Sequence, residues 1–236
     1  MKHMGPFEEL HVYGWSSSYQ MFHSLIMWPK RLTTLNFIMP MTWDVFARAG
    51  VREKWDLEEL EPILRLHKST LIELTVGTLE KSDLSKFNIS DYPALKYLGL
   101  SYGATRTETA FLENILPQTL KVFCWDLAVT RFGVYNERLP FDEPEEQFLE
   151  VLISKARERK VELEKIVLHF RQEVPRLYGY DLDQLASLAY PWDRVDEIAR
   201  RTGMCIEYNE PPVTRDQLKD WTKSLREELE AALETG

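Results

Sequence analysis

A six-residue pattern, apolar-x-x-apolar-x-apolar, recurs along this chain and constrains its fold more than any other feature. Six clear copies begin at Phe7, Leu32, Leu71, Leu95, Leu120 and Leu163, and a degenerate seventh runs from Met204 to Tyr208. Three of the intervals between their last positions are 24 or 25 residues, and the other three are 39 to 43 residues. The short intervals fall within the range of leucine-rich repeats. The long ones correspond to a repeat with an insertion, near residues 38–70, 127–160 and 170–200.

Between these copies, apolar residues recur at the spacing of an amphipathic helix. The segments that show this spacing are 21–26, 57–64, 111–115, 148–153, 182–188 and 195–198. Short strands that alternate with helices predict an α/β fold. We expect a leucine-rich-repeat-like right-handed solenoid over residues 7–210, with about seven short parallel strands on its concave side and helices outside. Because the pattern is already present at Phe7, we also expect the chain to be part of a longer protein.

A doubly wound α/β fold is the alternative, because it also alternates strands with helices. Both faces of its sheet are covered, so its strands are longer and almost continuously apolar. The strands predicted in this chain are short, and polar residues interrupt them. The sequence therefore favours a sheet with one uncovered face.

The C-terminal segment, residues 211–236, differs from the repeats. Apolar residues recur there at helical spacing, at Leu218, Trp221, Leu225, Leu229 and Ala232. Thr214 and Gln217 form a capping box ahead of them. We predict an amphipathic helix that caps the last repeat, and a helix that binds a partner or forms a dimer is the alternative.

Charge and composition exclude several classes of partner. The net charge of −9 argues against nucleic-acid binding, which needs basic side chains to neutralise phosphates. It also disfavours docking to anionic lipid, and no apolar run approaches the roughly 18 residues of a membrane-spanning helix. Cys124 and Cys205 lie too far apart in sequence for a disulfide framework or a metal motif. Reduced thiols are typical of the cytoplasm or nucleus.

The sequence carries no recognisable catalytic, metal or cofactor motif. Its five histidines lack the spacing of zinc ligands, and phosphate-binding, dinucleotide-binding and serine-hydrolase motifs do not occur. Cys124 has no assignable base beside it, so we expect a buried thiol rather than a nucleophile. We predict a protein that is not an enzyme. The alternative is a small-ligand enzyme on a doubly wound fold, with its site at the carboxyl ends of the strands.

The residues between the apolar positions of each strand define a candidate binding surface. Side chains alternate along a strand, so these residues lie on the sheet face away from the helices, which we call the open face. The candidate protein-binding residues there are His11, Tyr13, Asn36, Ile38, Thr75, Tyr97, Asp126, Lys165 and His169. This mixture of aromatic, small and a few charged side chains suits a protein or peptide partner, and we expect the chain itself to be a monomer. An unused sheet face is the alternative.

Several short stretches carry a family resemblance. They are Leu139-Pro140-Phe141, the acidic helix start that follows it, Ala156–Lys160 (ARERK), Tyr190–Arg194 (YPWDR) and Leu116–Lys121 (LPQTLK). In their amino-acid sequence and their order along the chain, these stretches resemble filamentous-fungal F-box/leucine-rich-repeat-like proteins. The resemblance in repeat pattern covers roughly residues 30 to 210. The resemblance implies substrate recognition in an F-box ubiquitin ligase. The F-box itself, a short helical motif with an LP start and a Trp near its end, does not occur in this sequence.

Overall fold

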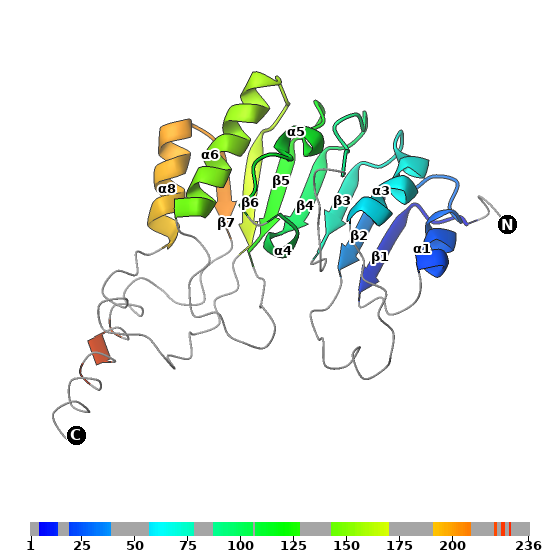
Figure 1. Ribbon diagram of the computed structural model, residues 1–236, viewed down its shortest axis with the longest axis horizontal. Helices are drawn as coiled ribbons and strands as arrows, with labels where there is room; N and C mark the ends of the chain where they lie inside the picture. Colours follow the sequence, from blue (N-terminus) through cyan, green and yellow to red (C-terminus); the bar gives the residue numbers. More distant parts are fainter. Residues whose placement is uncertain are drawn as a thin grey trace.

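The computed structural model describes residues 5–13, 19–38, 57–77, 87–105, 107–127, 143–169 and 191–208, with residues 220, 223, 224 and 227 near the C-terminus. Within these residues the chain forms one sheet of seven strands, all parallel, in which spatial order equals chain order (Figure 1). The strands are β1 (Glu9–Tyr13), β2 (Thr34–Ile38), β3 (Glu73–Val76), β4 (Tyr97–Ser101), β5 (Val122–Asp126), β6 (Lys165–His169) and β7 (Cys205–Tyr208). The prediction of a mixed α/β chain with about seven short parallel strands is confirmed.

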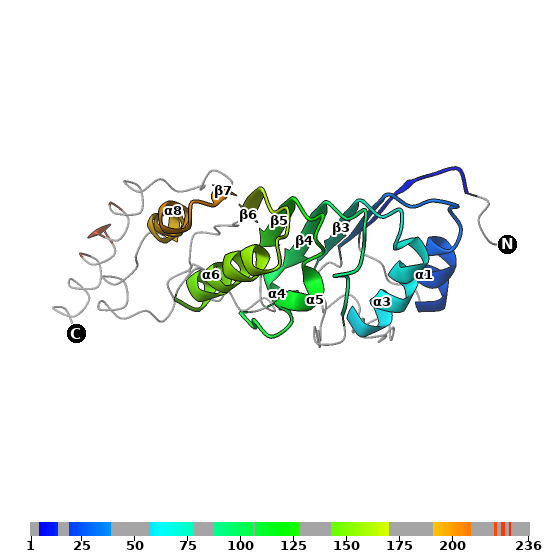
Figure 2. The ribbon, with the colours of Figure 1, turned by 90° about the horizontal axis from the view of Figure 1, so that it is seen from above.

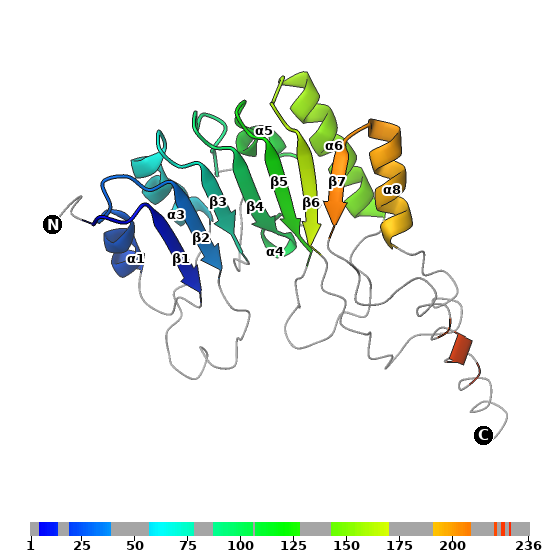
Figure 3. The ribbon, with the colours of Figure 1, turned by 180° about the vertical axis from the view of Figure 1, so that it is seen from behind.

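The helices of the described residues lie on one side of this sheet. They are α1 (Tyr19–Ile26), α3 (Leu57–Leu64) with the 3₁₀ helix η1 (Arg65–His67), α4 (Tyr102–Thr105), α5 (Leu112–Ile115), α6 (Glu143–Glu158) and α8 (Pro191–Thr202). Seen from above, the strands form a row with the helices beneath it (Figure 2). Seen from behind, the strands stand in front of the helices (Figure 3). No described helix covers the open face.

The hydrophobic core lies between the sheet and these helices. Each strand contributes alternate apolar residues to it, and in the central strands these residues are fully buried, as at Leu35, Leu74, Leu98, Phe123 and Ile166. The sheet register aligns these five residues across neighbouring strands. The equivalent residues of the first and last strands, Leu10 and Ile206, are only partly buried. An outer strand has a neighbour on one side only, so half of its lateral cover is missing.

Trp125 on β5 joins three elements in this core. Its indole nitrogen Nε1 donates a hydrogen bond to Oγ1 of Thr105, the last residue of α4, at 2.8 Å. Its ring lies 4.4 Å from that of Phe148 on α6, centroid to centroid. A buried indole needs such a partner, because an unpaired buried donor costs about 1–3 kcal/mol. This contact fixes α4 and α6 against the centre of the sheet.

The described residues within the long intervals between repeats form helices and no additional strand. β2 pairs directly with β3, β5 with β6, and β6 with β7, although the last apolar positions of these repeats are 39 to 43 residues apart. The described parts of these intervals contain α3, α6 and α8, respectively. Acidic residues open α6, as predicted, where they complement the positive end of the helix dipole.

Two predicted helices fall largely or wholly outside the described residues. The helix over 182–188 lies wholly outside them, and so do the apolar positions of the C-terminal segment. Within that segment, Asp220, Lys223, Ser224 and Glu227 are helical and exposed. These positions share one face of a helix, because residues three and four apart are neighbours on its surface.

Candidate functional site

The sheet register places all nine candidate residues on the open face in three rows. The first row contains Glu9, Thr34, Glu73, Tyr97, Val122, Lys165 and Cys205. The second contains His11, Asn36, Thr75, Gly99, Cys124, Val167 and Glu207. In the third, Tyr13 pairs with Ile38, and Ser101, Asp126 and His169 lie side by side. The face therefore brings together residues separated by more than 150 positions in sequence.

The β1 end of the open face is polar and aromatic. Tyr13 is 65% exposed, and its hydroxyl accepts a hydrogen bond from Nδ2 of Asn36 at 3.4 Å. His11 lies beside Glu9, with 3.8 Å between Nε2 and Oε2. The Oδ1 atom of Asn36 is buried and receives no hydrogen bond from the described residues. The exposed phenol of Tyr13 offers both apolar contact and hydrogen bonding to a partner.

The middle of the open face is built from small side chains. Gly99, Ser101 and Cys124 are buried although no described helix lies over them. A Cβ atom on Gly99 would lie 3.0 Å from Oγ1 of Thr75, closer than most real Cβ contacts. The glycine therefore lets the Thr75 side chain occupy this space, and no side chain of residue 99 protrudes from the centre of the open face.

Cys124 forms a small polar cluster with Tyr97 and His169. Its Sγ lies 3.8 Å from Nδ1 of His169 and shares a hydrogen bond with the Tyr97 hydroxyl. Burial raises the pKa of the Cys124 thiol. Burial, followed by the hydrogen bond to Cys124, also raises the pKa of the Tyr97 phenol. Both groups therefore stay protonated at neutral pH. The prediction of a buried thiol is confirmed, but the prediction that no base lies beside Cys124 is wrong, because the pairing of β5 with β6 brings Nδ1 of His169 to 3.8 Å from its Sγ.

The three rows carry an excess of negative charge. Glu9, Glu73, Asp126 and Glu207 contribute four carboxylates and Lys165 one ammonium group, a formal charge of −3 with the histidines neutral. Nζ of Lys165 lies 2.8 Å from Oε2 of Glu207. This hydrogen bond raises the pKa of Lys165, so the ammonium group stays charged, and the Glu207 carboxylate compensates its charge within the face.

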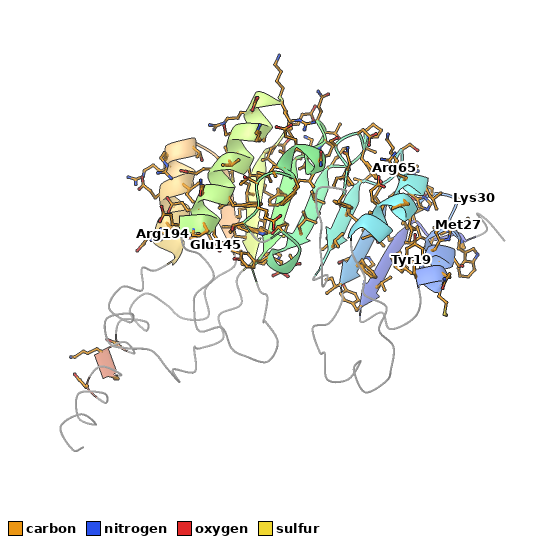
Figure 4. All side chains as sticks on the ribbon, in the orientation of Figure 1. Tyr19, Met27, Lys30, Arg65, Glu145 and Arg194 are labelled. Atoms are coloured by element: carbon orange, nitrogen blue, oxygen red, sulfur yellow. The ribbon has the colours of Figure 1, made fainter. Side chains whose placement is uncertain are left out.

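The helical side of the molecule contrasts with the open face. Glu146 on α6 pairs with Arg194 and Arg201 on α8, at 3.0 and 3.1 Å. Figure 4 labels Arg194 and Glu145, the residue before Glu146. Glu145 accepts a hydrogen bond from the Tyr102 hydroxyl at 2.8 Å. These acidic side chains join elements of the fold, whereas Glu73 on the open face has no ion pair with any described residue.

No group of three or more possible metal ligands occurs among the described residues. Two candidate residues, His11 and His169, belong to β1 and β6 and are separated by four intervening strands. None of the described helices is both long and apolar enough to cross a membrane. The geometry of the described face is that of an extended surface rather than a convergent set of reactive groups.

Sequence reasoning missed two residues of the open face, Cys205 and Glu207. Both residues belong to β7, where the repeat pattern is incomplete. The alternation of Met204, Ile206 and Tyr208 is the signal that identifies them, because the residues between must point to the opposite face.

Comparisons with known proteins give no match. No protein-family model, curated protein or solved structure matches the chain. The resemblance to F-box/leucine-rich-repeat-like proteins therefore rests on the short stretches quoted above. Four of these stretches have described places in the fold. Leu116–Lys121 leads directly into β5, the acidic stretch begins α6, Ala156–Glu158 ends α6, and Pro191–Arg194 begins α8.

Proposed function

We propose that this chain is a leucine-rich-repeat-like solenoid that binds a protein partner on its open face. The observation that carries the proposal is a sheet face over which no described helix lies, and which presents polar and aromatic side chains in aligned rows. Solenoid repeats commonly use such an extended sheet for binding. The proposed role is recognition rather than catalysis.

The arrangement of elements supports a solenoid over a doubly wound sheet. Strand order follows chain order without reversal, whereas a doubly wound sheet reverses its order at a switch point. The described helices lie on one side only (Figures 1 and 3). The open-face rows contain Glu, His and Lys side chains, which a sheet covered on both faces would have to bury.

The composition of the open face favours a protein over other ligands. Tyr13 and Tyr97 supply the aromatic contact area that is enriched in protein interfaces. The formal charge of −3 opposes a phosphate backbone. Thr34, Thr75 and Asn36 add short polar groups that can hydrogen-bond to a peptide backbone.

The family resemblance narrows the biological setting of this proposal. F-box/leucine-rich-repeat-like proteins use their repeats to select substrates for ubiquitin ligation, so substrate recognition or scaffolding in the cytoplasm or nucleus is the proposed role. The chain would act as a monomer in this role, because the described rows of the open face all come from one copy.

A pull-down from a filamentous-fungal lysate tests the proposal. The bait with Tyr97→Ala and His169→Ala should lose proteins that the unchanged chain captures. A matched bait with Gln147→Ala and Ser154→Ala, two exposed positions on α6, should retain them. Tyr13→Ala provides a second open-face variant, since this largely exposed side chain contributes little to the core. Circular dichroism confirms that each bait is folded. Identical captures by all four baits would contradict the proposal.

A further inference from the structure

We propose that the partner segment on the open face is cationic, an extended peptide that carries lysine or arginine. This inference rests on the proposed function and specifies the chemistry of its partner. It starts from the net charge of the face, in which four carboxylates stand against one ammonium group. Since Lys165 is paired with Glu207 at 2.8 Å, the inference depends on the exposed carboxylates of Glu9 and Glu73.

Glu73 is the most informative of these carboxylates. It is exposed on β3, in the middle of the sheet, and no described cation pairs with it. Its register neighbours are Thr34 on β2 and Tyr97 on β4. Its negative charge raises the pKa of the Tyr97 phenol, although less than burial does. The local field is therefore negative at a site where a partner's cation could be held.

An aromatic ring beside an exposed carboxylate fits a guanidinium or ammonium group. Tyr97 is such a ring, because it is the register neighbour of Glu73 in the first row. A cation over the face of an aromatic ring gains about 0.5–1 kcal/mol at exposed sites. An arginine can stack on the ring and donate to a carboxylate at the same time, because its guanidinium is planar.

The spacing of Glu9 and Glu73 indicates the form of the peptide. Thr34 lies between them in the first row, so they are two strand spacings apart, about 9.5 Å. A polyproline II segment rises about 9.3 Å in the three residues of one turn. A peptide that crosses the strands in this form would present a cation to each carboxylate when its basic residues are three positions apart.

Fluorescence anisotropy with synthetic peptides tests this inference. The probe is a labelled nine-residue peptide with Arg at every third position and Pro between, and the comparison peptide has Glu in place of each Arg. The unchanged chain should bind the Arg peptide and not the Glu peptide, and added salt should weaken binding because the charges are exposed. The double variant Glu9→Lys and Glu73→Lys should bind the Arg peptide about tenfold more weakly, since each reversal replaces an attraction by a repulsion.

The control separates a specific face from general attraction to an acidic protein. Glu108→Lys and Glu158→Lys make the same charge change at exposed positions outside the open face, and this variant should bind within about twofold of the unchanged chain, since the peptide's contacts are retained. Equal weakening by both double variants, or no binding by the unchanged chain, overturns the proposal of a cationic partner.

The lysate pull-down separates this inference from the proposed function. If a lysate protein is lost by Tyr97→Ala with His169→Ala but kept by Glu9→Lys with Glu73→Lys, this inference fails and the proposed function stands. If both variants keep it, both fail.

Discussion

Thr75 on β3 packs against Gly99 on β4 so closely that a Cβ on residue 99 would lie 3.0 Å from the Thr75 hydroxyl oxygen and 3.1 Å from its methyl carbon. The two residues are register partners in the second row of the open face. Glycine weakens the interior of a strand, and it commonly marks a close approach of another group. Here that group is a threonine side chain, so the two residues form a unit at the centre of the proposed binding surface.

The first prediction concerns this pair. Gly99→Val should lower the free energy of unfolding by about 1–3 kcal/mol, because the added side chain overpacks against Thr75. The loss should be smaller when Thr75→Ala is already present. Urea unfolding of the two single variants and the double variant measures the coupling. An equal loss in both backgrounds would show that the contact does not control this position.

The second prediction concerns the indole of Trp125. Trp125→Phe removes the hydrogen bond to Thr105 and leaves a cavity against Phe148, so it should cost about 1–3 kcal/mol of stability. Trp28→Phe is the matched control, because Trp28 is 47% exposed. It should change stability by less than about 0.5 kcal/mol. Similar losses in the two variants would contradict the central role of Trp125.

The third prediction concerns the two thiols. Cys205 is exposed, and Cys124 is buried with a raised pKa. A raised pKa leaves less thiolate at a given pH, and burial blocks the reagent, so Cys124 should react slowly with a disulfide reagent at pH 8. In native Cys205→Ser, the remaining thiol should therefore stay almost unlabelled, and denaturant should release it. Rapid labelling of this variant before denaturation would disprove the burial.

The fourth prediction concerns the end of α8. Gly203 follows this helix with a φ of 67°, a left-handed conformation that disfavours other residues. Nothing lies within 4 Å of a Cβ built there. Gly203→Ala should therefore cost about 1 kcal/mol through backbone strain alone. Gly203→Asn should cost less, since asparagine tolerates this region, and thermal unfolding measures the difference.

The positions of the strands could be predicted from the sequence, because each follows from a local alternation of apolar residues. Leu98 and Leu100, for example, predict that Gly99 lies on the opposite face, and the register agrees. The contacts within the face could not be predicted. Cys124 and His169 meet across 45 residues of sequence. They are diagonal neighbours rather than register partners, and the repeat pattern does not specify which diagonal side chains come into contact. The burial of Ser101 could not be predicted either, since it depends on neighbours contributed by other strands.

Site-specific photo-crosslinking tests the central claim most directly. A photoreactive amino acid is placed at Tyr97 on the open face or at the exposed Gln147 on α6, and each protein is irradiated in lysate. The account predicts that position 97 yields a discrete crosslinked partner, that position 147 does not, and that excess unlabelled chain suppresses the product. A partner crosslinked from position 147 and absent from position 97 would place binding on the helical side and contradict the account.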